Sequence, residues 1–294
     1  MKIEQLQHLM AIVEQGSLRA AARRMELPQP ALTRSVRALE RELGTSLFAR
    51  QTTGMVLTAE GTRFHRRASA IVHEFRRARE EVQRPGPAYE GTVSVALSIM
   101  PHLRMLPEAL PVFRRSYPRV KLEITESLLP GVEGALRDGG LDFYLGAAPS
   151  LKPAAGLALQ RLRDNTRVVV CRRGHPLARV RSLKALAGAH WAATTIDHNA
   201  EEDLARLFDS HGLAVPQVML RAHSALSVLV ALAETDLLAM LPQQWTGFAM
   251  TRDLLATVPV REALPAPDIV MVRKPELPLS PPAEFLLDVM LRSL

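Results

Sequence analysis

Apolar residues recur every three or four positions in the first part of the chain, and this spacing predicts short amphipathic helices. The first helix ends at Gly16 and has an apolar side made of Ile3, Leu6, Met10 and Val13. Ser17 suits the N-cap of a second helix, in which three successive alanines allow another helix to approach closely. We therefore expect two short helices before residue 28, packed side by side.

A third helix is predicted to begin at the sequence "PQP", because proline is tolerated in a first helical turn and its fixed φ stiffens that turn. One side of this helix is apolar and should face the core, with Leu32, Val36, Leu39 and Leu43. The opposite side carries Thr33, Arg34, Arg37 and Arg41. A tight turn followed by such a helix is typical of a helix-turn-helix, whose second helix enters the major groove by its N-terminal end.

The first turn of this third helix holds the residues that would read DNA. Gln29 can pair with an adenine edge, Thr33 can touch a phosphate or a thymine methyl group, and Arg34 can contact guanine or phosphate. A solvated helix face with Glu40 and Glu42 nearby would carry the same arginines. This pattern alone therefore leaves both interpretations open.

Two short extended segments, about 47–50 and 56–58, predict a small wing around a Thr/Gly turn. From the N-cap Thr58 a long helix then runs unbroken until Pro85. Its apolar positions are spaced 4, 3, 4, 3 and 4 residues apart, a heptad pattern suited to pairing with a second helix, at Phe64, Ala68, Ile71, Phe75, Ala78 and Val82. Packing of this helix on its own domain is the alternative.

Beyond Gly91 short apolar strands alternate with helices, which predicts mostly parallel sheets covered by helices on both faces. The last strand, "DIVMVRK", and the helix after it look like a return to the first half of this region. We therefore expect two α/β lobes, joined by two crossings of the chain, with a cleft between them.

Ligands of such sheets bind beyond the carboxyl ends of the strands, beside helix N-termini. Here those positions are rich in hydroxyl groups, which favours a small anion such as a carboxylate or sulfonate. The candidate effector-binding residues are Ser98, Ile99, Met100, Pro101, Ser127, Leu128, Thr194, Thr195, Ile196, His223 and Ser224. Each hydroxyl taken singly could be a helix cap, so the interpretation depends on the convergence of four such places.

The net charge of +7 is unevenly distributed, because residues 1–84 hold 15 Lys and Arg against 9 Asp and Glu. Such asymmetry is typical of a nucleic-acid-binding segment joined to another domain. No apolar run approaches the ~20 residues that span a bilayer, so a soluble, cytoplasmic protein with no membrane partner is expected. The single cysteine, Cys171, excludes an internal disulfide, and a buried strand thiol is favoured over a redox sensor.

Two other classes of protein remain open at this point. An enzyme would carry a nucleophile, a metal set or a cofactor motif, and the chain has no HExxH, P-loop, GxSxG or GxGxxG sequence. A free small-molecule-binding protein of the solute-binding fold would explain the lobes, but it would be expected to carry an export signal and would leave the basic N-terminal part unexplained. We expect no catalytic residues, no cofactor and no metal.

From Val13 through Gly61 the chain matches most of the pattern FxxIVExGSLxxAAxxLxxxQPALxRxxxxLExxLGxxLFxRxxxGxxLTxxG, and it thereby resembles the LysR-type transcriptional regulators. The resemblance implies a multi-domain protein: a winged helix-turn-helix domain over 1–58, a linker helix and hinge over 59–87, and an effector-binding regulatory domain over 88–294. That domain would be α/β and Rossmann-like, similar to type 2 periplasmic binding proteins, with lobes at about 88–162 plus 267–294 and at about 163–266.

Candidate DNA contacts that match the family's motif are Gln29, Pro30, Thr33, Arg34 and Arg50. Further candidates are Ser17, Arg37 and Thr52. The chain departs from the family at Pro28, where a serine is usual, and at Thr53, where a basic residue is usual. At Pro28 a hydroxyl that could cap the helix or hold a phosphate is missing, and at Thr53 one expected phosphate contact is missing.

The resemblance also implies partners in a bacterial cytoplasm. The linker helix would pair two copies, which places two reading helices one DNA turn, ~34–36 Å, apart on an imperfect palindrome, and two dimers would form a homotetramer. A small effector would shift the population of lobe arrangements, and with it DNA bending and contact with RNA polymerase. The sequence does not indicate the effector, the promoter, or whether transcription rises or falls.

Overall fold

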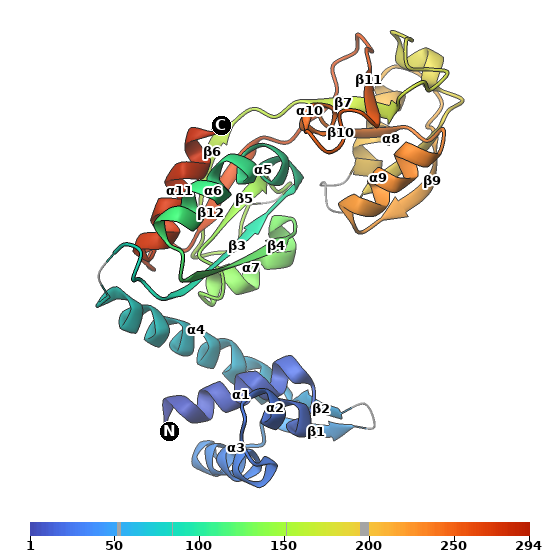
Figure 1. The fold of residues 1–294 in the computed structure, drawn as a ribbon. Coiled ribbons are helices and arrows are strands. Elements are labelled where there is room, and N and C mark those ends of the chain that lie inside the picture. Colours follow the sequence, from blue (N-terminus) through green and yellow to red (C-terminus); the bar gives the residue numbers. More distant parts are fainter. Residues whose placement is uncertain (52–53, 84, 151, 195–199) are drawn as a thin grey trace. The chain divides into compact units, whose positions relative to one another are not determined.

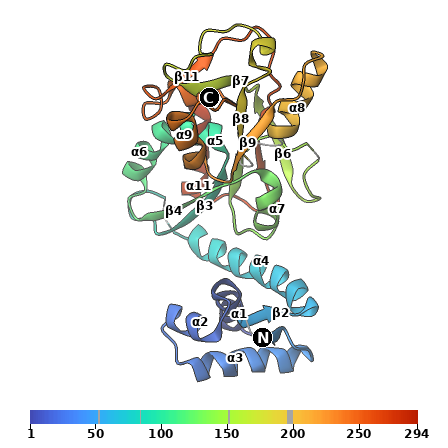
Figure 2. The same ribbon diagram turned by 90° about the vertical axis from the view of Figure 1, so that its right-hand side faces the viewer.

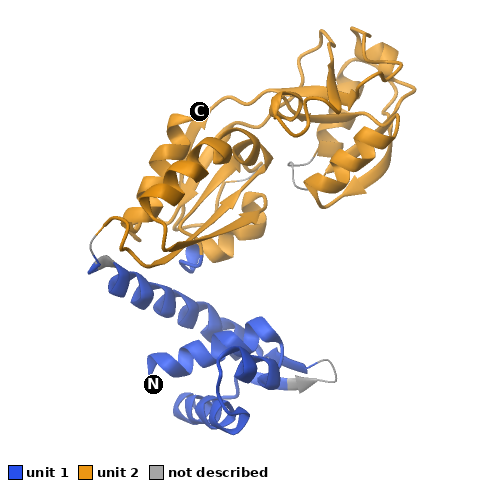
Figure 3. Ribbon diagram, in the orientation of Figure 1, with its two compact units in different colours: residues 1–83, 137–140 blue, residues 84–136, 141–294 orange. Residues whose placement is uncertain are grey.

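The computed structural model describes residues 1–51, 54–83, 85–150, 152–194 and 200–294. The contacts within the chain divide it into two units (Figure 3). The N-terminal unit consists of residues 1–83 and 137–140, and the C-terminal unit of residues 84–136 and 141–294. None of the described helices is long and apolar enough to cross a membrane.

The N-terminal unit is a helical domain with a two-stranded antiparallel wing. Its elements are α1 (Ile3–Gln15), α2 (Leu18–Arg24), α3 (Gln29–Leu43), β1 (Phe48–Gln51), β2 (Gly54–Leu57) and α4 (Ala59–Glu81). Helix α1 contacts both α3 and α4 and lies between them (Figures 1 and 2). The predicted helices and wing are thus confirmed.

Local signals begin and end these helices, and at Gly16, Ser17 and Thr58 they do so where the sequence predicts. Gly16 and Gly44 end α1 and α3 in the left-handed conformation, with φ of 66° and 67°. Ser17 and Thr58 begin α2 and α4, and each side-chain oxygen accepts the backbone N–H three residues later. Because these signals involve neighbouring residues only, they can be read from the sequence.

The core of the N-terminal unit differs in part from the predicted pattern. Leu6, Leu9 and Ile12 form the buried side of α1, whereas Met10 and Val13 are partly exposed. Because α1 packs between two helices, its buried side is centred on Leu6, Leu9 and Ile12 rather than on the predicted row that includes Met10 and Val13. Leu43 is exposed because it is the last residue of α3 and extends past the core.

Glu40 attaches the wing to α3. Its Oε1 accepts the backbone N–H groups of Leu47 at 2.8 Å and of Phe48 at 3.3 Å. Leu47 is fully buried beside Leu39 in the core that α1, α3 and α4 share. Glu40 therefore stabilises the turn between α3 and β1 rather than serving only as a surface charge.

The first lobe of the C-terminal unit is built on a five-stranded sheet with the order β4-β3-β5-β12-β6. β3 is parallel to β4 and β5, while β12 runs antiparallel to β5 and β6. Separate buried clusters on its two faces include residues of α6 and α11 on one and α7 on the other. The elements are β3 (Gly91–Leu97), α5 (Ile99–Arg104), α6 (Leu106–Ser116), β4 (Val120–Glu126), α7 (Leu129–Arg137), β5 (Phe143–Ala147), β6 (Ala158–Arg163), β12 (Ile269–Arg273) and α11 (Pro281–Arg292).

The second lobe contains the antiparallel sheet β10-β7-β11 and the parallel pair β8-β9. A parallel bridge between Trp191 and Leu238 connects the two. The elements are β7 (Arg167–Arg172), η1 (Leu183–Leu186), β8 (His190–Thr194), α8 (Ala200–Ser210), β9 (Gln217–Ala222), α9 (Ala225–Glu234), β10 (Ala239–Pro242), α10 (Gln244–Gly247) and β11 (Leu255–Val258).

The expectation of mostly parallel sheets is correct for β3, β4 and β5 and wrong for β7, β10 and β11. Apolar strands look alike in either direction, so the direction depends on how the chain crosses between lobes. The return of β12 to the first lobe is confirmed by its pairing with β5. β6, α10 and β11 lie outside the predicted elements; β6 is an almost fully exposed edge strand, so it lacks an apolar pattern.

Glu40→Ala should loosen the wing, because two backbone N–H groups lose their acceptor, at a cost of about 1–3 kcal/mol. We expect hydrogen exchange of the segment around residues 45–57 in the full-length chain to accelerate about tenfold or more. Glu42→Ala is the control, since Glu42 pairs with the exposed N-terminal amine. Equal exchange in the two variants would contradict the role of Glu40.

Candidate DNA-binding surface and effector-binding segments

Helix α3 exposes the side on which the candidate DNA-binding residues lie. Gln29, Pro30, Arg34 and Arg37 are exposed and Thr33 is partly exposed, while the opposite side of the helix is buried. The structure therefore places these five candidates on one accessible surface of the N-terminal unit, as the sequence predicts.

An open groove of about 950 Å³ runs beside this surface, lined by Arg34, Arg37, Glu40, Arg41, Gly44, Thr45, Ser46, Thr58 and Glu60. Arg41 lies on the side of α3 that the sequence predicts to be polar, but Arg41, Thr45 and Ser46 are not among the predicted DNA contacts. Arg41 lies one helical turn beyond Arg37, and this four-residue spacing is the signal that could have added it. The groove adds cationic and hydroxyl groups of the kind that contact phosphates.

The remaining candidate DNA contacts, Ser17, Arg50 and Thr52, lie outside α3. The Ser17 hydroxyl accepts the Ala20 N–H at 3.1 Å and thus serves as the N-cap of α2. Arg50 belongs to β1, and Thr52 lies outside the described residues. Thr53, the second departure from the family pattern, is also outside them.

A hydrogen bond between His8 and Ser35 fixes α3 against α1. Nδ1 of His8 lies 2.7 Å from the Ser35 hydroxyl. Burial lowers the pKa of His8, although the nearby Glu4 acts in the opposite direction. The neutral imidazole is therefore favoured at neutral pH, and the contact depends on a hydrogen bond rather than on a charge.

The apolar heptad positions of α4, which form a row called the seam below, divide into a buried part and an exposed part. Ala68 has no exposed surface, and Phe64 packs against the same core as Leu6 and Leu9. The expectation that Ala68 pairs with a second helix is therefore wrong, because the N-terminal unit covers it, whereas Phe64 is only partly buried and its pairing stays a prediction. The rest of the seam, Ile71, Phe75, Ala78 and Val82, is exposed.

In the first lobe, the structure brings two predicted effector-binding segments together at the ends of adjacent parallel strands. Ser98 follows β3 and is 4% exposed, and its hydroxyl accepts the Ala147 N–H at 3.2 Å. Ser127 follows β4, and its N–H donates to the carbonyl oxygen of Leu97. The Ser127 hydroxyl donates to the carbonyl oxygen of Leu128 at 3.0 Å.

Helix α5, which follows Ser98 directly, is shared by the cores of both lobes. Met100 packs in the first lobe with β3 and β5. Ile99 and Leu103, four residues apart on one side of α5, pack in the second lobe with Trp245 of α10. Sequence reasoning did not identify Leu103 and Trp245, because their importance depends on a contact between segments about 140 residues apart.

In the second lobe, Thr194 and the His223–Ser224 segment also lie at the ends of adjacent parallel strands, since Thr194 pairs with Ala222. Thr194 is buried, His223 is exposed, and Ser224 is the N-cap residue of α9 without a side-chain capping hydrogen bond. Thr195 and Ile196 lie outside the described residues.

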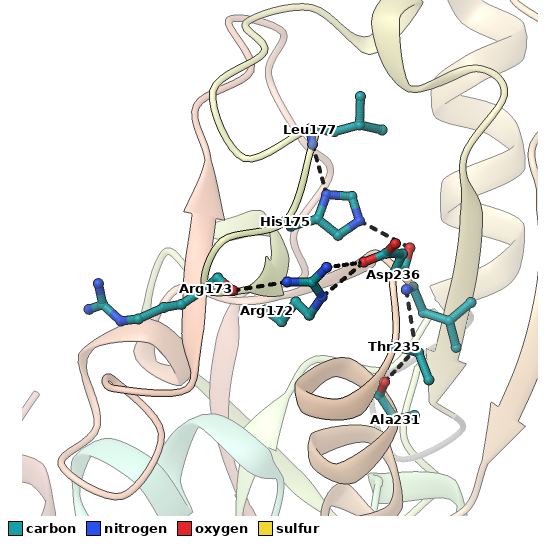
Figure 4. A network of polar contacts seen from close by, with 8 residues as sticks. Arg172, Arg173, His175, Leu177, Ala231, Thr235 and Asp236 are labelled. Atoms are coloured by element: carbon teal, nitrogen blue, oxygen red, sulfur yellow. Dashed lines mark hydrogen bonds and ion pairs between the residues drawn. The ribbon is translucent and has the colours of Figure 1, made fainter.

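The other end of α9 is held by the polar network in Figure 4. Arg172 donates to Asp236 through Nε at 2.8 Å and pairs with it through a terminal nitrogen at 2.7 Å. Nδ1 of the buried His175 accepts the Leu177 N–H at 2.9 Å, so Nε2 is the nitrogen that donates to the Asp236 carbonyl at 3.1 Å. This network fixes the loop between α9 and β10 on the turn that follows β7.

Cys171 lies fully buried in β7, and burial raises the pKa of its thiol, which is the opposite of what a reactive thiolate needs. Its Sγ contacts the Ala256 carbonyl oxygen at 3.6 Å. The predicted buried strand thiol is thus confirmed.

Within the described parts of the chain, no three His, Cys, Asp or Glu residues are placed so that they could hold a metal ion.

A winged helix-turn-helix unit with an exposed basic reading helix, joined by a long helix to a two-lobed α/β unit, defines a DNA-binding regulator with a ligand-binding domain. Residues 3–62 match the family model of the bacterial regulatory helix-turn-helix proteins of the LysR family, and residues 88–294 match that of the LysR substrate binding domain. The chain therefore belongs to the LysR family of transcriptional regulators.

Similar proteins agree with this assignment. The chain is 30% identical to the SDS degradation transcriptional activation protein of Pseudomonas sp. (strain ATCC 19151), over 82% of this chain and 78% of that protein. It is 27% identical to the HTH-type transcriptional regulator GbpR of Azospirillum brasilense, over 80% and 70%. The solved structure of full-length CbnR in complex with its target DNA has the same fold, with a TM-score of 0.69, 21% identity and complete coverage of both chains.

Proposed function

We propose that this regulator binds its operator through the exposed side of α3 and that a small anionic effector, held at the strand ends of the C-terminal unit, modulates this binding. The observation that supports the first part is the division of α3 into a buried apolar side and an exposed side with Gln29, Arg34 and Arg37. The hydroxyl groups of Ser98, Ser127 and the helix start at Ser224 support the second part.

We also propose that the chain acts on DNA as a dimer or as a tetramer of two dimers. Ile71, Phe75, Ala78 and Val82 leave an apolar row exposed along α4, with Phe75 50% and Val82 84% exposed. Pairing with the same row of a second copy would remove this row from water. A dimer would present two α3 helices to an imperfect palindrome, and RNA polymerase would respond to the resulting DNA geometry.

Helix α5 provides a physical route from the effector to the lobes. A ligand bound at Ser98–Pro101 would contact a segment whose neighbours Ile99 and Leu103 are buried in the other lobe. Two lobe arrangements would then differ in their affinity for the effector, and this difference alone supplies the free energy of the response. We favour regulation over catalysis, since the relatives are regulators and no catalytic group has been identified in the described residues.

Arg34→Ala should abolish specific operator binding, since one good base contact contributes about 1–3 kcal/mol and the groove also loses a cation. Footprinting of the full-length protein on the DNA between its gene and the neighbouring gene measures this loss. Arg79→Ala removes the same charge from the last turn of α4 and should leave the footprint intact. An unchanged footprint for Arg34→Ala would refute the contact.

Phe75→Asp should weaken self-association at least tenfold, because burial of a charge in an apolar seam costs more than the apolar contact it replaces. Sedimentation velocity over a concentration series measures the oligomeric state. Met250→Asp is a matched control, since Met250 is an exposed apolar residue of the C-terminal unit. If both variants associate as the wild type does, the exposed half of the seam is not the interface.

Ser98→Ala should raise the effector concentration needed for a response about tenfold, in line with the loss of one hydrogen bond to an anion, without changing DNA affinity in its absence. Footprints with substrates and products of the enzymes encoded beside the gene test this. Ser127→Ala is a second variant, because its hydroxyl donates to the neighbouring Leu128 carbonyl and its loss should not disturb folding. Wild-type responses from both variants would remove these serines from the site.

A further inference from the structure

The first turn of α3 offers few backbone N–H groups to DNA. Pro28 and Pro30 have no amide hydrogen, and the N–H groups of Ala31 and Leu32 both donate to the Pro28 carbonyl, at 2.9 and 3.3 Å. Among residues 28–32, these facts leave only the Gln29 N–H for an outside partner. A helix start that binds phosphate normally directs several such amides at it, so this turn is poorly suited to hold a phosphate.

The hydroxyl of Thr33 is also committed to the protein. It donates to the carbonyl oxygen of Gln29, one helical turn earlier, at 2.9 Å. A phosphate oxygen can only accept hydrogen bonds, so it would have to displace this internal bond to contact the hydroxyl. The hydroxyl oxygen could still accept a hydrogen bond from a base amino group, but for any partner that only accepts hydrogen bonds or is apolar, the γ-methyl group is what Thr33 offers.

We infer that Thr33 is a specificity-determining residue and that its γ-methyl group packs against the C5-methyl group of a thymine in the operator. Thr33 is partly exposed on the same side of α3 as Gln29 and Arg34. Thymine is the one base that presents a methyl group in the major groove, so an apolar contact there discriminates without a hydrogen bond. This inference rests on the proposed entry of α3 into the major groove.

Operators in which single thymines are replaced by deoxyuridine test the inference directly, because the replacement removes only the C5-methyl group. A footprint of the full-length protein first defines the operator. Dissociation constants are then measured by fluorescence anisotropy at one fixed salt concentration. We expect one thymine in each half-site at which deoxyuridine weakens wild-type binding about fourfold, the factor that burial of one methyl group contributes.

Two variants separate the methyl group from the hydroxyl. Thr33→Ser keeps the hydroxyl and loses the methyl group in both protomers, so it should bind the natural operator about fourfold more weakly per half-site, or about sixteenfold in all, and show no further loss at that deoxyuridine position. Thr33→Val keeps a methyl group and loses the hydroxyl; valine is β-branched like threonine, so the helix is little affected. This variant should retain the sensitivity of the wild type to deoxyuridine.

Three results would overturn the inference. The wild type could be insensitive to deoxyuridine at every position, or Thr33→Ser could remain as sensitive as the wild type. Loss of binding by Thr33→Val but not by Thr33→Ser would show that the hydroxyl makes the contact instead. Absence of any footprint would refute the proposed operator binding itself, which is a separate outcome.

Discussion

The burial of α1 between α3 and α4 is the constraint on which the proposed DNA-binding arrangement depends. Leu6 and Leu9 of α1, Leu39 of α3 and Ala68 of α4 belong to one buried cluster. Full burial of a leucine side chain contributes about 1.5–3 kcal/mol, so a displacement of the reading helix relative to α4 would expose apolar surface at a substantial cost. Pairing of the exposed half of α4 with a second copy would therefore fix the position of α3 as well.

A comparable sharing of core residues occurs in the C-terminal unit. The segment after β3 contributes Met100 to one core cluster and Ile99 to another. Closely packed interiors change between discrete arrangements rather than deform continuously. A ligand at Ser98 would act next to side chains that belong to two packed cores, which is a favourable place for a small contact to alter the relation between the lobes.

Features that depend on neighbouring residues could be predicted from the sequence, and features that depend on distant contacts could not. The caps at Ser17 and Thr58 and the polar side of α3 follow from local rules. Glu40 could not be recognised as an acceptor for the wing, because a carboxylate on an amphipathic helix looks the same whether it meets solvent or a turn seven residues away.

The heptad of α4 shows a second limit of the same kind. Spacing identifies an apolar row but not which molecule covers it, and here Ala68 is covered by the chain's own core while Phe75 is exposed.

The candidate effector segments show a third limit. Their convergence within each lobe follows from parallel pairing of the strands, whereas the internal bond of Ser98 to Ala147 depends on the exact spacing of β3 and β5.

The replacement of the family's usual serine by Pro28 affects how binding energy is divided on α3. With few amide groups at the helix start, contacts to phosphates would fall mainly to Arg37 and Arg41 along the groove. Such contacts release counterions and weaken steeply with salt, but they carry no sequence information. Base recognition would fall to Gln29, Thr33 and Arg34, and the contributions of the two uncharged side chains would depend much less on salt. In this protein, affinity and specificity would thus be assigned to successive turns of one helix.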